Sequence, residues 1–285
     1  MKTSQALLAA AILSAGLLSA TGAHASNSNN SRTAENELAG ITPVPAGYVI
    51  PKWADRLDIV GVKIGMPAAQ AIQALRTHNP KFDIKTEQIQ LENVGTPSAW
   101  VVNAKVSNGT ERIEVRLALP PLPSVATAIR RVISFSLGNE PTITSVMESL
   151  QAKYGNGFTR INSNRNLYTF IWRLDGQRVE QPGKATGCYY DVLSTREVND
   201  YTEFIQEFQN VGNAIRIAKA CGVVVMASIH PSLKNDQLAD SFIVKVSSEP
   251  FRASSLQKTV TYLNSLDQAR RNKEAAGRKS NDVKM

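Results

Sequence analysis

The stretch WVVNAKVSNGTERIEVRLAL, residues 100–119, carries the clearest structural pattern in the chain. Apolar side chains occupy every second position on each side of its centre: Trp100, Val102, Ala104 and Val106, then Ile113, Val115, Leu117 and Leu119. Such alternation is typical of strands with one buried face, and Asn108-Gly109 suits a tight turn that needs positive φ. The stretch therefore predicts an antiparallel hairpin.

Two passages of the chain share one plan around this hairpin. The apolar run Ile59 to Ile64 ends at Gly65, and Pro67 then opens a segment with Ala71, Ile72 and Leu75 on one helical face. The run Val132 to Leu137 ends at Gly138, and Thr142 opens a similar segment with Val146, Met147 and Leu150. These helices should stop at Asn79-Pro80 and at Gly155. We predict an α+β fold of two tandem units, each an amphipathic helix packed on an antiparallel sheet, plus a C-terminal helix.

The remaining elements follow from the same patterns. Strands are predicted at 82–91, at 168–174 before an Asp175-Gly176 turn, at 188–193, at 222–229 and around 242–246. Asp200 and Glu203 resemble a capping box that opens a helix carrying Phe204, Phe208 and Val211. The C-terminal helix starts near Ser254. Its apolar stripe ends at Ala269, and we expect the last dozen residues, 274–285, to be frayed.

The amino end has the pattern of an export signal. Lys2 precedes the apolar run Ala6 to Leu18, and Ala23-His24-Ala25 offers the small side chains that a signal peptidase accepts. We predict a signal peptide at 1–25 that is cleaved after Ala25, which implies a periplasmic or secreted protein. A polar, disordered tether at 26–37, the two units at 38–123 and 124–250, and a C-terminal helix with a basic tail at 251–285 complete the organisation. No stretch after the signal peptide is long and apolar enough for a transmembrane span.

The charge is concentrated at the carboxyl end. The formal net charge is +8, and a net +4 of it lies in the tail, where two acids accompany Arg270, Arg271, Lys273, Arg278, Lys279 and Lys284. A solvated helix end explains this tail, and weak contact with an anionic polymer or lipid is the alternative. Nucleic acid is not favoured as a partner, because no binding fold or aromatic platform accompanies the charge.

The two cysteines, Cys188 and Cys221, form an even set in a chain predicted to enter an oxidising compartment. We predict a disulfide between them. The alternatives, metal ligation and a nucleophilic thiol, need partner residues that the surrounding sequence does not supply.

A search for catalytic groups leaves few candidates. His78 falls at a helix end, where a cation suits the dipole, and His230 precedes Pro231 in a predicted loop. Ser255 and Lys258 have Ser-x-x-Lys spacing, but the other motifs of the penicillin-binding enzymes are missing. The acids Asp191, Glu197, Asp200, Glu203 and Glu207 read as a solvated helix face rather than a glycosidase pair. We predict no catalytic, cofactor or metal site, and therefore no enzyme.

A resemblance rests on Gly65-Met66-Pro67 with Leu75, on Ser145 to Gly155, and on the order of a helix followed by strands. From Ile59 to Val246 the chain looks like tandem modules of the SmpA/BamE type, which are similar in plan to the β-lactamase inhibitor protein. The chain departs from the lipoprotein members because no cysteine follows the cleavage site.

The resemblance implies protein binding, since members of this group bind other proteins. With the tandem units, the predicted disulfide and the lack of a complete catalytic constellation, it leads to the hypothesis of a non-enzymatic protein-binding or inhibitory module whose partner is another envelope or extracellular protein. The alternative hypothesis is a carboxylate-dependent hydrolase that acts on cell-envelope substrates.

Overall fold

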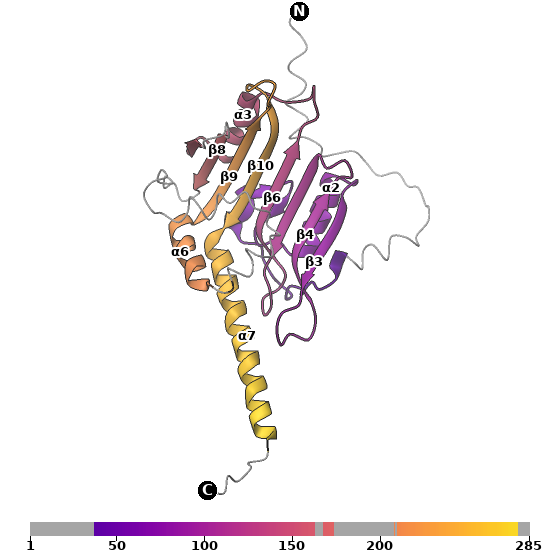
Figure 1. Cartoon of the computed structure of the whole chain (residues 1–285), viewed down its shortest axis with the longest axis vertical. Coiled ribbons are helices and arrows are strands. Elements are labelled where there is room, and N and C mark those ends of the chain that lie inside the picture. The colour runs from indigo at the N-terminus through magenta and orange to yellow at the C-terminus, as the bar shows by residue number, and fades with distance from the viewer. Residues whose placement is uncertain (1–36, 163–167, 174–207, 209, 279–285) are drawn as a thin grey trace, which may run out of the picture.

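The computed structural model of the 285-residue chain describes residues 37–162, 168–173, 208 and 210–278 (Figure 1). The predicted signal peptide, nearly all of the tether, Cys188 with its strand, the Asp175-Gly176 turn and the five-acid cluster lie outside the described residues.

An eight-stranded antiparallel sheet organises the fold, in the order β3-β4-β5-β6-β10-β9-β8-β7. Its strands are β3 (Asp83–Ile89), β4 (Ser98–Lys105), β5 (Glu111–Leu117), β6 (Ala126–Ser134), β7 (Phe158–Asn162), β8 (Tyr168–Arg173), β9 (Val223–Pro231) and β10 (Ala239–Ser248). The predicted hairpin of residues 100–119 is β4 and β5. Antiparallel sheets combined with helices confirm the α+β class.

Two helices cover one face of this sheet. They are α2 (Ala68–His78) and α3 (Ile143–Tyr154), and both begin and end close to the positions that the sequence predicts. Thr142 caps α3 by accepting a hydrogen bond from the Ser145 amide at 3.1 Å. Their apolar stripes join the inward residues of both halves of the sheet in a single core.

Two other helices pack near one end of the opposite face: α6 (Val211–Cys221) and α7 (Glu249–Gly277). Val224 contacts Ile217 and Cys221 of α6, whereas its neighbour Val225 belongs to the main core. Because adjacent strand residues point to opposite faces, α6 lies across the sheet from α2 and α3. α7 packs against α6 near its start and then runs away from the sheet (Figure 1).

The sequence patterns missed several local features. The run Ile59 to Ile64 is split into β1 (Asp58–Ile59) and β2 (Val62–Lys63), because Val60 and Gly61 adopt positive φ and turn the chain. A short 3-10 helix, η2 (Lys52–Arg56), precedes this hairpin. Trp100 leaves the face of Val102 because the β3–β4 register shifts beside it, and it packs with Val101 instead.

Two further differences concern helices. α6 is not predicted by the sequence patterns; it begins after Asn210, whose side chain caps it. The helix predicted from Asp200 lies, apart from Phe208, outside the described residues up to Asn210 and stays a prediction. The predicted fraying is wrong for residues 274–277, because α7 stays helical to Gly277; residues 279–285 lie outside the described part of the chain.

Candidate functional site

The sheet face opposite α2 and α3 carries charged side chains in its centre. The register places Glu114 beside Arg130, and both oxygens of Glu114 accept from Arg130 Nη1, at 3.2 and 3.1 Å. Arg112 Nε lies 3.1 Å from the same carboxylate. The Glu114 and Arg130 side chains are 1% and 6% exposed, and buried charges persist only when paired. This carboxylate is a structural ion-pair partner rather than a free acid.

A second buried carboxylate fixes the start of α7. Glu249 accepts hydrogen bonds from Ser247 Oγ at 2.6 Å and from Arg252 Nε at 2.8 Å. Burial opposes its ionisation, but the charges of Arg252 and Lys245 and these hydrogen bonds hold the pKa of Glu249 below its ordinary value. The ionised Glu249 therefore anchors α7 to the end of β10.

His78 does have a charged partner, which sequence reasoning missed. Its Nε2 lies 3.1 Å from Glu111 Oε1, and Arg131 Nε donates to the same oxygen at 2.8 Å. Burial opposes ionisation of Glu111, but its partners His78 and Arg131 lower the pKa of that carboxyl overall. Glu111 is 33 residues from His78 in sequence, so no local pattern signals the contact.

His230 lies in strand β9, not in the predicted loop. Burial lowers its pKa, against the opposing charge of Asp240. Its neighbour Ile229 is in the main core, so His230 points to the face opposite Glu111 and His78. The sheet thus separates the two histidines.

Ser255 and Lys258 do not form a nucleophile and base. Ser255 is 5% exposed, and its Oγ donates to the Phe251 carbonyl at 2.8 Å, whereas Lys258 is exposed. The hydroxyl is committed to the helix backbone.

The aromatic side chains of β8 belong to the core. The Phe158 ring lies 5.3 Å from Phe170, edge to face, and 5.5 Å from Trp172, and Tyr154 lies 5.9 Å from Trp172. Trp172 Nε1 also donates to the Gly155 carbonyl at 2.7 Å. Burial raises the pKa of the Tyr154 hydroxyl. These rings therefore stabilise α3 on the sheet and offer no exposed binding surface.

A groove of about 250 Å³ lies between α7 and the loop that joins β3 to β4. We call it the α7 groove, and its lining residues are Glu92, Asn93, Phe208, Val260, Leu263, Asn264 and Asp267. The loop contributes one carboxylate, Glu92, and α7 contributes the other, Asp267. Its apolar lining comes from segments far apart in sequence, which explains why no motif signals it.

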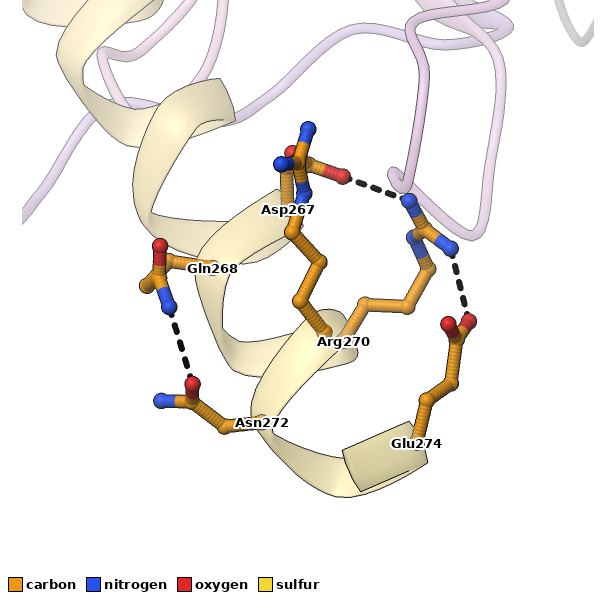
Figure 2. A network of polar contacts seen from close by, with 6 residues as sticks. Asp267, Gln268, Arg270, Asn272 and Glu274 are labelled. Carbon is orange, nitrogen blue, oxygen red and sulfur yellow. Dashed lines mark hydrogen bonds and ion pairs between the residues drawn. The ribbon is translucent and has the colours of Figure 1, made fainter. Parts of the chain in front are cut away.

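Beyond the groove α7 continues as a free helical end, in which every residue from 268 to 278 is exposed. Figure 2 shows what holds it: Arg270 contacts Asp267 at 2.7 Å and Glu274 at 2.6 Å, and Gln268 donates to Asn272 at 2.8 Å. Arg271 adds a 2.7 Å contact to Asp267. Pairs at these spacings stabilise a solvated helix, which explains why residues 274–277 are helical rather than frayed.

Among the described residues, no three His, Cys, Asp or Glu side chains gather as a metal site would require. None of the helices within the described ranges has the length and apolar character needed to cross a membrane. Cys221 is fully buried at the end of α6, but Cys188 lies outside the described residues, so their disulfide stays a prediction.

Comparison with known proteins gives no relative: no protein-family model, curated protein or solved structure matches the chain.

Proposed function

We propose that the protein is an exported, non-enzymatic protein-binding or inhibitory module that acts on another envelope or extracellular protein. The signal-peptide pattern of residues 1–25 supports the compartment. The observation that carries the binding role is the free end of α7.

The strand order supports a tandem construction. Among the described residues, four strands follow α2 and four follow α3, and the two sets run β3-β4-β5-β6 and β10-β9-β8-β7 across the sheet. This division places β6 in the first unit, whereas the boundary predicted at 123/124 places it in the second. The last strand of each set, β6 or β10, thus lies beside the other at the centre. Two copies of one helix-plus-four-strand unit, related by an approximate two-fold axis, would produce this order. Such a plan agrees with the resemblance to tandem periplasmic binding modules.

The free end of α7 supports binding to another molecule. A helix that is polar on all sides can extend through solvent toward a second body, provided that side-chain pairs along it keep it formed. Here the pairs around Arg270 keep the helix formed, although it buries nothing against the described body. The helix is thereby preorganised, which lowers the entropy cost of binding.

The alternative hydrolase reading finds one candidate pair, Glu92 and Asp267, because both line the α7 groove. A glycosidase needs a general acid whose pKa is raised. Hydrogen bonding from Arg270 and the nearby arginine charges instead lower the pKa of Asp267. Asp267 therefore cannot be the general acid, and its partner Glu92 is exposed to solvent rather than enclosed in an apolar pocket as such an acid would be. The binding role is the better supported proposal.

Photo-crosslinking in cells tests this proposal. A benzoylphenylalanine at Ala275 or Ala276, both exposed on the free end of α7, should give a discrete adduct with one protein. The control position is Gln73, an exposed residue of α2. Absence of any adduct, or the same adducts from Gln73, would refute the binding role.

A further inference from the structure

The α7 groove combines an apolar lining with acidic charge. Phe208, Val260 and Leu263 supply the apolar side chains, and the charged residues that line the groove are Glu92 and Asp267. Asp267 is engaged by two arginines of α7, but Glu92 is exposed and makes no ion pair with any described residue. In a chain of net charge +8, Glu92 thus gives the groove one carboxylate that has no counter-charge among the described residues.

The groove also leads onto the free end of α7. Val260, Leu263 and Asp267 are spaced three and four residues apart and so share one side of the helix. The next positions on that side are Arg270, Arg271 and Glu274, in the exposed part. A segment that occupies the groove would therefore continue along the charged side of α7.

A second copy of this chain is a poor occupant. If two α7 helices paired through Val260 and Leu263, the following seam positions would be Asp267, Arg270 and Glu274. Coiled-coil seams need apolar side chains at these positions, and successive charges there cost stability. The chemistry favours a different polypeptide.

We propose that the α7 groove binds an exposed segment of a partner protein that presents a lysine or arginine beside a large apolar side chain. The apolar side chain contacts Leu263, Val260 and Phe208, and the cation lies near Glu92. This inference rests on the proposed binding function and names the chemistry of the partner.

Two synthetic peptides test the inference without the partner. Both peptides have six residues, an acetylated amino end and an amidated carboxyl end, and both contain two leucines. One carries two lysines, and the other carries two glutamates at the same positions. Titrated into the full exported protein, the lysine peptide should shift the backbone amide resonances of Asn93, Leu263 and Asn264. The glutamate peptide should leave them unchanged.

Substitutions at Glu92 make the test specific. Glu92→Gln should weaken binding of the lysine peptide about fivefold, as loss of one exposed charge pair would. Glu92→Lys should reverse the preference toward the glutamate peptide. The matched control is Glu148→Gln, an exposed acid on α3 at the other end of the sheet (Figure 1), and it should change nothing.

The possible results separate failure of the groove inference from failure of the proposed function. Equal binding of both peptides, or shifts away from the groove, would overturn the inference and leave the crosslinking result at α7 standing. Groove shifts that depend on protein concentration alone would also overturn it, because they would identify a second copy as the occupant. Lysine-selective binding without any crosslinked partner would support the groove chemistry and refute the proposed function.

Discussion

α7 begins and ends with the same kind of ion pair in two different environments. At its start Arg252 lies 2.6 Å from Glu249, and near its end Arg270 lies 2.7 Å from Asp267, both at i,i+3 spacing. The Glu249 and Asp267 side chains are 3% and 27% exposed. Near-identical geometry therefore has different consequences: the buried pair holds the helix to the sheet, and the solvated pair only keeps the helix formed.

The largest expected effect comes from the buried end. Glu249→Ala leaves Arg252 beside an empty site and removes the acceptor of Ser247, so the free energy of unfolding should fall by about 3 kcal/mol. Urea denaturation at neutral pH measures it. Glu274→Ala, at the solvated end, is the matched control. Equal stability of the two variants would show that the buried ion pair contributes no more to the free energy of unfolding than the solvated one.

The predicted Cys188–Cys221 disulfide should have the next largest effect. Cys221 ends α6, and Ala214 and Ala218 of α6 pack on Ala253 and Leu256 of α7. The disulfide should therefore stabilise the buried first part of α7 and leave its exposed end unaffected. Its loss should cost roughly 2 to 4 kcal/mol and lower the melting temperature by several degrees. Mass spectrometry of the oxidised protein checks the bond, and alkylation of both thiols under native conditions would contradict it.

How far the sequence predicts the structure depends on the range of the interactions. The helices α2 and α3 and the β4–β5 hairpin follow from local periodicity, capping and turn residues, and they appear close to the predicted positions. The polar networks do not follow, because register between distant strands brings Glu114 to Arg130 and Glu111 to Arg131.

The α7 groove is less predictable still. It joins residues near 92, 208 and 260 through tertiary packing alone. The helical end of α7 is an intermediate case: Asp267, Arg270 and Glu274 have the spacing of helical ion pairs, whereas the loss of the apolar stripe beyond Ala269 favours fraying.

An intermediate case lies in the Glu111 network, where the Glu111 and Arg131 side chains are 15% and 16% exposed. Glu111→Gln should lower the free energy of unfolding by about 1 to 2 kcal/mol at pH 7. The pKa of Glu111 is lowered from 4.5 in the folded protein, so its contribution is complete above that value and disappears as the pH falls through the lowered pKa.

Denaturation of wild type and Glu111→Gln between pH 7 and pH 3 should therefore show converging stabilities on acidification. A difference that stays constant or grows at low pH would contradict this assignment.

The smallest effect is expected at the solvated end of α7. Arg270→Gln removes the contacts to Asp267 and Glu274, which are among the interactions that hold the free helical end. Global unfolding should not change measurably, because no residue from 268 to 278 is buried against the described body. Amide exchange of this segment should instead accelerate, and high salt should do the same to wild type by screening the pairs. Unchanged exchange would mean that the pairs do not hold the helix, whereas a large drop in global stability would mean that the end of α7 packs like its start.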